Sequence, residues 1–275
     1  MFNDMMRAEI WLQETLDSQQ SLGSLAARLG YSSSQIRRRF RQCFGTSPSV
    51  YREGLRQERA GRLLVHTPLS ISEVAERCGY RNHSAFSRAF QRYHHKTPRA
   101  YRHSQRVALR RRPREFESPL AMLIRRQSRQ AAIVTRRYAP LPTPDPWSAG
   151  LNGDDGLPAR LNHATAIALL HEAPGSARLP RLDIGVLVDE QEGELMSMPP
   201  SLRLVTLPGE RCACVSMPNA RHLSEVLDRL LGDSLPALGE HYSGEAMRLL
   251  PRRSGLELQL PLMAETAPAD MPTAP

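Results

Sequence analysis

Residues 22–51, LGSLAARLGYSSSQIRRRFRQCFGTSPSVY, recur with substitutions as residues 71–101, ISEVAERCGYRNHSAFSRAFQRYHHKTPRAY. The offset between the copies is 49 residues at Gly30 and 50 residues at Phe40, so the second copy has gained one residue. Each copy opens with a short amphipathic helix, breaks at Gly-Tyr and continues in a second helix that carries arginine. This pattern predicts a duplicated helix-turn-helix, which indicates double-stranded DNA as the partner.

Charge is distributed unevenly along the 275 residues. Residues 1–116 hold 22 Lys and Arg against 9 Asp and Glu, a net charge of +13, whereas residues 117–275 hold 15 against 19, a net charge of −4. A basic half of this kind is typical of a surface that contacts phosphate groups. The basic run at residues 110–114 is either a solvated linker or a further phosphate contact, and its composition leaves both alternatives open.

The sequence argues against several other classes of protein. It has no run of 18 apolar residues, and the opening MFNDMMRAEIWLQ lacks the basic and apolar regions of a signal peptide, so we expect a cytoplasmic protein without a membrane partner. We expect no metal and no cofactor, because the cysteines lack the spacing of a zinc site or a disulfide framework. They are Cys43, Cys78, Cys212 and Cys214.

The length accommodates two domains with separate cores. The first is predicted to be mainly α, with two helix-turn-helix subdomains joined by a helix over residues 48–65 that would span about 27 Å. The second is predicted to be α+β, with a helix at residues 222–231. Its predicted strands are residues 131–135, 164–170, 184–188, 202–207, 211–216 and 256–260. The predicted boundaries are 1–105 for the DNA-binding domain, 106–127 for a basic linker, 128–263 for the second domain and 264–275 for a disordered tail.

The second helix of each copy carries the candidate DNA contacts. In such a motif this helix lies in the major groove and reaches the bases from its outward face. Ile36 and Phe40 are the expected core anchors of the first copy, which leaves Arg37 and Arg38 as base readers; arginine pairs with guanine through two hydrogen bonds. In the second copy the anchors are two phenylalanines. The residues expected to face outward there are His83, Ser84, Ser87 and Arg88.

A single basic helix is usually just a solvated face, but two copies with equivalent anchors favour DNA reading. Adjacent major-groove sites on one side of DNA are about 34 Å apart, which the predicted linker helix and its flanking turns could span. We therefore expect a monomer or weak dimer that covers an asymmetric site of roughly 20 base pairs.

Further motifs extend the repeat through the linker helix. They include Gly30-Tyr31-Ser32, Ile36-x-Arg38-x-Phe40, Gly45-x-Ser47-Pro48-x-x-Tyr51, Arg56-x-x-x-Ala60-x-x-Leu63-Leu64, Val74-Ala75-x-x-Cys78-Gly79-Tyr80 and Thr97-Pro98-x-x-Tyr101-Arg102. Together these motifs closely resemble the AraC/XylS family of transcription regulators over about residues 5–105. The resemblance implies regulation of transcription, with RNA polymerase as a further partner. It places the family's base contacts on Ser34, Arg37 and Arg38 and on His83, Ser84, Ser87 and Arg88. Residues 94–96, His-His-Lys, depart from the family by replacing its usual glycine turn.

The second half resembles the GyrI-like, or SOUL-type, ligand-binding domain of Rob-type regulators over about residues 128–262. The resemblance is carried by residues 181–186, RLDIGV, by residues 207–213, LPGERCA, and by residues 257–261, ELQLP. It implies that Glu257 lies in a pocket for a cationic or aromatic effector, because a buried carboxylate without a partner favours a cation. The alternation of Leu and polar residues around Glu257 equally fits an exposed strand residue. The candidate pocket aromatics are Tyr138, Trp147 and Tyr242.

Three other functions compete with a sensing regulator. The second domain could be a degenerate sensor that contacts proteins, or the whole chain could be an architectural DNA binder without sequence preference. The third alternative, a GyrI-like hydrolase, is disfavoured because Glu257 has no recognisable catalytic partner and no Gly-x-Ser-x-Gly or phosphate-binding loop occurs. We therefore expect a regulator that is not an enzyme.

Overall fold

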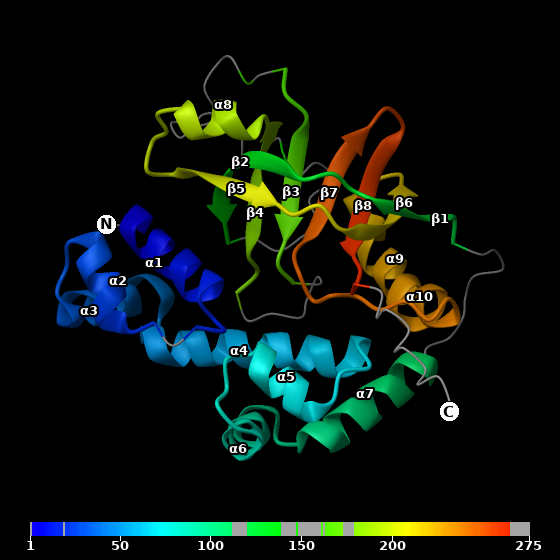
Figure 1. Ribbon diagram of the computed structural model, residues 1–275, viewed down its shortest axis with the longest axis horizontal. Helices are drawn as coiled ribbons and strands as arrows, with labels where there is room; N and C mark the ends of the chain where they lie inside the picture. Colours follow the sequence, from blue (N-terminus) through cyan, green and yellow to red (C-terminus); the bar gives the residue numbers. More distant parts are fainter. Residues whose placement is uncertain are drawn as a thin grey trace, which may run out of the picture.

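The computed structural model describes residues 2–18, 20–111, 120–138, 147, 161, 163–172 and 179–264. A helical part and a sheet part lie against each other, with α4 (Pro48–His66) running below the sheet in Figure 1. The predicted tail beyond residue 264 and residues 112–119 of the predicted linker fall outside the described residues. The other helices of the helical part are α1 (Phe2–Glu14), α2 (Leu22–Leu29), α3 (Ser33–Phe44), α5 (Ile71–Arg77), α6 (His83–His94) and α7 (Pro98–Arg111).

Each copy of the repeat forms a helical lobe with its own apolar core. The first core, between α1, α2 and α3, is built around Phe40, and the second, between α4, α5 and α6, around Phe90; both rings are 0% exposed. Helix α4 takes part in both, because Tyr51 near its start packs on the first core and Leu63 near its end lies within the second. The two helix-turn-helix subdomains and their linker helix are therefore present as predicted. Helix α7 continues through residue 111, so residues 106–111 of the predicted linker are helical.

The second part contains a sheet of eight strands in which every neighbouring pair is antiparallel. The order across the sheet is β1-β6-β8-β7-β3-β4-β2-β5. The strands are β1 (Met122–Arg126), β2 (Gln130–Arg137), β3 (Ala166–Leu170), β4 (Leu182–Val188), β5 (Leu202–Leu207), β6 (Arg211–Met217), β7 (Met247–Arg252) and β8 (Gly255–Pro261). An antiparallel sheet with a few short helices fits the α+β class predicted for this half.

The two faces of the sheet differ because side chains alternate along each strand. Ile184 and Leu258 lie on the face that packs against the helices, where they join the largest apolar cluster of the described residues. On the other face Arg248, 2% exposed, donates to the carbonyl oxygen of Pro208 and pairs with Glu210. The short helical segments are α8 (Glu190–Leu195), η2 (Ala220–His222), α9 (Leu223–Arg229), the π-helical η3 (Leu230–Ser234) and α10 (Leu235–Ala237).

All six predicted strands are present as β2 to β6 and β8, and the predicted helix at residues 222–231 corresponds to α9 with its flanking turns. Two strands were missed. β1 is an edge strand in which the apolar Leu123 is exposed and the last two residues are arginines, so it lacks the buried apolar pattern of an inner strand. β7 contains Pro251 and the buried Arg248, two residue types that usually argue against an inner strand.

Helix α1 and the sheet are joined by a buried charge network. Arg136, near the end of β2, donates from Nη1 to Oε2 of Glu9 at 2.7 Å and from Nε to Oδ1 of Asp183 at 2.6 Å, and all three side chains are 0% exposed. Asp183 also accepts from Arg203 at 2.7 Å. Burial opposes the charge of Arg136, but Asp183 and Glu9 outweigh it and raise the pKa of the guanidinium. These charges attach the first lobe to the sheet.

None of the helices in the described parts of the chain is long and apolar enough to cross a membrane. Three cysteines, Cys78, Cys212 and Cys214, are buried, and Cys43 is partly buried. Burial raises the pKa of the Cys78 thiol to about 11 and that of Cys212 to about 12, as expected for thiols in apolar surroundings. Within the described residues, no group of three or more His, Cys, Asp or Glu is arranged to hold a metal ion.

Candidate nucleic-acid interface

The turn between α2 and α3 is built by local capping. Gly30 ends α2 with a φ of 71°, a left-handed conformation that glycine adopts without strain. Ser32 begins α3, because its side chain accepts from the backbone N–H of Gln35 while the Gln35 side chain accepts from the N–H of Ser32. This capping box fixes where the second helix starts, and therefore which residues occupy its first exposed turn.

Helix α3 presents the predicted DNA contacts on its outer face. Its anchors Ile36 and Phe40 are 0% exposed, whereas Arg37 and Arg38 are exposed to solvent. Ser34 is also exposed, and its hydroxyl shares a hydrogen bond with Ser32. In the part of the chain that the structure describes, neither arginine has an acidic partner. Both guanidinium groups therefore remain available for phosphates or base edges.

The second copy needs glycine at its turn more strictly than the first. Gly79 has a φ of 75°, and a Cβ there would lie 2.3 Å from the carbonyl oxygen of Leu16 and 2.9 Å from Nη2 of Arg56. The backbone of the second copy thus contacts the segment that follows α1 of the first lobe. Asn82 then begins α6, because its side chain accepts from the backbone N–H of Ala85.

Helix α6 repeats the arrangement of α3. Phe86 is 0% exposed on its inner face, as is Phe90. His83, Ser84 and Arg88 are exposed, whereas Ser87 is partly buried. The structure therefore places six of the seven predicted contacts on exposed faces of the two recognition helices. The seventh predicted contact, Ser87, is partly buried, which limits how far its hydroxyl group extends from the helix.

The departure from the usual glycine turn has a structural consequence at the end of α6. His95 has a φ of 57°, and it is the one non-glycine residue with positive φ among the described residues. Gly45 occupies the equivalent position after α3, with a φ of 71°. A side chain in this left-handed conformation is strained by roughly 1–2 kcal/mol. The second recognition helix therefore ends in a less stable cap than the first.

Several arginines that sequence reasoning left undifferentiated bind backbone carbonyl groups inside the helical part. Arg56 of α4 donates from Nε to the carbonyl oxygen of Leu16 at 3.0 Å. Arg102 of α7 donates to the carbonyl oxygen of Leu64 at 3.1 Å, and Arg106 to that of Val65 at 3.0 Å. These last two satisfy carbonyl groups at the C-terminal end of α4, which intrahelical bonds leave free. Arginines of this kind have a structural role, in contrast to Arg37, Arg38 and Arg88.

The linker helix spaces the two recognition helices. It has 19 residues, close to the prediction, and corresponds to about 28 Å at the rise of an α-helix. Gln57 is buried within it and donates to the hydroxyl group of Tyr80, which in turn donates to Glu53 at 2.6 Å. Burial and the neighbouring Glu53 raise the pKa of the Tyr80 hydroxyl. Polar bonds as well as apolar contacts thus fix the second lobe on α4.

Comparison with known proteins gives the class of this helical part. Residues 25–104 match a family model described as a helix-turn-helix domain. The chain is 31% identical over 94 residues to the HTH-type transcriptional regulator MtrA of Neisseria gonorrhoeae, a match that covers 33% of this chain and 31% of that protein. It is 32% identical over 95 residues to the transcriptional regulator Rob of Salmonella typhimurium, covering 34% of this chain and 33% of that protein. A solved DNA-binding domain of AdpA, in complex with a target DNA, is 35% identical and has a TM-score of 0.37, covering 40% of this chain and 96% of that one.

The N-terminal part of the chain is therefore a helix-turn-helix DNA-binding domain. It is of the type found in AraC-family transcription regulators. The chain spans about a third of the length of the curated relatives it matches. The family model ends at residue 104, before the first strand of the sheet.

The aromatic residues predicted to line an effector pocket in the sheet part each have contacts within the protein. The hydroxyl of Tyr138 donates to Glu9 at 2.9 Å, whereas the hydroxyl of Tyr242 donates to the carbonyl oxygen of Glu245. Trp147 packs against the large apolar cluster. Each candidate aromatic thus has its own structural contact.

Glu257 fits neither of its two predicted environments fully. It is 9% exposed, so it is not an exposed strand residue, yet it accepts from Arg252 at 2.7 Å and from Gln259 at 2.7 Å. Burial acts to raise its pKa, but these hydrogen bonds and the charge of Arg252 outweigh burial and lower it. Glu257 was expected to lack a charged partner, but in the structure it is paired with Arg252.

Proposed function

We propose that this chain is a sequence-specific regulator of transcription whose helices α3 and α6 enter successive major grooves of one DNA duplex. The proposal is supported by the equivalent placement of Arg38 and Arg88, each two residues before a fully buried phenylalanine and each exposed to solvent. Among the described residues neither forms an ion pair. The 19-residue linker helix supports a single chain covering both grooves, which lie about 34 Å apart.

Arg38→Ala and Arg88→Ala test the proposal directly. Each should weaken specific binding by about 1–3 kcal/mol and relax base preference at one position, because a guanidinium that pairs with guanine is lost. The two positions should lie about one helical turn of DNA apart. Arg253→Ala is the matched control, since Arg253 is exposed on the sheet part, far along the chain from both recognition helices.

The measurement is DNA footprinting combined with selection of bound sequences from a random pool. Loss of contrast at the same base position in both variants would contradict two separate grooves. Equal affinity for selected and competitor DNA in the unmodified chain would instead favour an architectural binder.

We extend the proposal to the sheet part as a sensor, with Glu257 as its predicted effector contact. Arg252 already pairs with Glu257, so a hydrophobic cation that binds there must replace Arg252. Calorimetry on the full chain should then show weaker binding of the cation after Glu257→Gln, with a neutral analogue little affected. Equal affinity of both chains for the cation would remove Glu257 from the effector site.

A further inference from the structure

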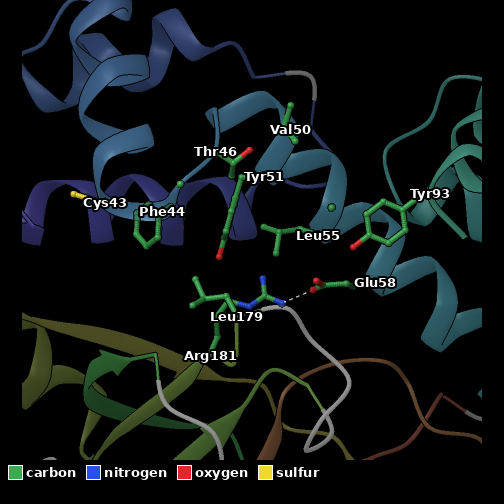
Figure 2. Close-up of a pocket in the computed structure, with 12 residues that line it drawn as sticks. Cys43, Phe44, Thr46, Val50, Tyr51, Leu55, Glu58, Tyr93, Leu179 and Arg181 are labelled. Carbon is green, nitrogen blue, oxygen red and sulfur yellow. Dashed lines mark hydrogen bonds and ion pairs between the residues drawn. The ribbon is translucent and has the colours of Figure 1, made fainter.

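A cavity of about 490 Å³ lies where the two lobes and the sheet part meet. Phe44 and Tyr51 line it from the first lobe and α4, Tyr93 lines it from α6, and Leu179 and Arg181 line it from the sheet part (Figure 2). Its volume is in the range of cavities that hold small molecules, which often lie between domains. Any compound bound there would contact all three bodies at once.

The polar wall of this cavity is an ion pair with spare hydrogen-bonding capacity. Nη2 of Arg181 donates to Oε2 of Glu58 at 2.9 Å and also pairs with Glu172. Arg181 is 5% exposed, yet its Nε has no hydrogen-bond partner among the described residues. Figure 2 shows the guanidinium directed toward α4, between Tyr51 and Glu58. Because Nε itself is closed to solvent, a ligand in the cavity reaches this guanidinium at its terminal nitrogens, which carry further N–H donors for an acceptor supplied from outside the chain.

The charges of the wall restrict what that acceptor can be. An anion that approaches Arg181 also meets the carboxylates of Glu58 and Glu172, and both side chains are largely buried, at 15% and 4% exposed. A cation that approaches Glu58 meets the guanidinium instead. An uncharged carbonyl oxygen accepts from Arg181 without either repulsion and leaves the ion pair intact.

The remaining walls suit an apolar ring. Phe44 and Tyr51 have ring centroids 5.7 Å apart, and Leu55 lies beside them on α4. Gly54 adds space, because a Cβ at that position would have no neighbour closer than 3.9 Å, the hydroxyl oxygen of Tyr93. Aromatic and aliphatic side chains around one polar group are the usual lining of a small-molecule site.

We propose that this cavity binds a small uncharged compound that has an apolar ring and a carbonyl oxygen, with Arg181 donating to that oxygen. Such a ligand bridges α4, the second recognition helix and the sheet part, and so stabilises one relative placement of the two lobes. An effect of this ligand on DNA affinity rests on the function proposed above. Binding of the ligand to the cavity does not rest on that function, and it is measured without DNA.

Three indole compounds of matched size separate the charge classes: indole-3-acetamide, indole-3-acetate and tryptamine. Calorimetry with the full chain should show that the amide binds at least about tenfold more tightly than the acetate or the amine. Tighter binding of either charged compound would overturn the ligand class, and absence of saturable binding of the amide at millimolar concentration would overturn the site.

Gly54→Leu tests the location, because the new side chain enters the cavity while α4 gains helix propensity. Binding of the amide should fall at least about tenfold. Gly23→Leu is the matched control, since Gly23 is an exposed glycine in α2. The affinity of this variant for the amide should be unchanged. Tyr93→Ala, which removes a wall residue that is 38% exposed, gives a second measurement and should also weaken binding. Unchanged affinity in either cavity variant would overturn the proposal, whatever the outcome of the DNA experiments.

Discussion

Replacing Arg136 by methionine removes the central charge of the network between helix α1 and the sheet. Glu9 and Asp183 then remain buried, each 0% exposed, without the guanidinium that pairs with both. Glu9 keeps hydrogen bonds from Tyr51 and Tyr138, but these are neutral groups. Removing one partner of a buried ion pair typically costs about 3–5 kcal/mol, and Glu9 should carry most of this loss because Asp183 keeps its ion pair with Arg203.

The matched control is Arg129→Met, which breaks a pair of the same chemistry at the surface. Arg129 donates to Glu190 at 2.6 Å, but its side chain is 65% exposed. Exposed pairs of this kind contribute little to stability, because water screens the two charges. The comparison therefore isolates burial as the variable.

Urea denaturation of the full chain, followed by circular dichroism, gives the free energy of unfolding for each variant. Arg136→Met should lower it by at least about 3 kcal/mol more than Arg129→Met. Adding Glu9→Gln to Arg136→Met should recover part of the loss, because one uncompensated charge is removed. A loss equal to that of the surface control would refute the conclusion that this network attaches the first lobe to the sheet.

Three further predictions concern stability and separability. Burial lowers the pKa of His66 and of His171 from 6.5 to about 4, so the native state favours the neutral rings. The free energy of unfolding should therefore fall as pH drops from 6.5 to 4. In urea titrations, the double variant His66→Gln with His171→Gln should show a weaker dependence of this free energy on pH. His95→Gly should raise the stability of the chain by about 1 kcal/mol in the same assay, and a decrease would contradict strain at that cap. A fragment of residues 1–111 should fold and bind DNA as a monomer with a steep dependence on salt, because both helical cores lie almost entirely within it; a requirement for dimers would contradict this.

The helical part could be predicted closely from the sequence because its signals are local. Gly30, Ser32 and the spacing of Ile36 and Phe40 determine a turn and a helix within a few residues, and the repeat shows the pattern twice. The strands with continuous apolar runs could also be predicted, because an apolar run is a local signal. β7 was missed because the feature that makes Arg248 acceptable in a buried strand is Glu210, which lies on a different segment of the chain.

The junction between the two parts could not be predicted for the same reason. Glu9 and Arg136 lie 127 residues apart, and each on its own looks like an ordinary surface charge. Likewise, nothing in the local sequence separates Arg56, which binds a backbone carbonyl, from Arg38, which faces solvent. Which arginines are structural depends on tertiary contacts that no local pattern encodes.

The long separation of Glu9 from its partners also sets an order of events during synthesis. At about 5–20 residues per second, the ribosome reaches Asp183 roughly 10–35 seconds after Glu9. The buried residues of both helical cores end at Phe90, so these cores are complete before Arg136 and Asp183 are made. The DNA-binding half of a nascent chain therefore becomes able to fold first, and its attachment to the sheet follows.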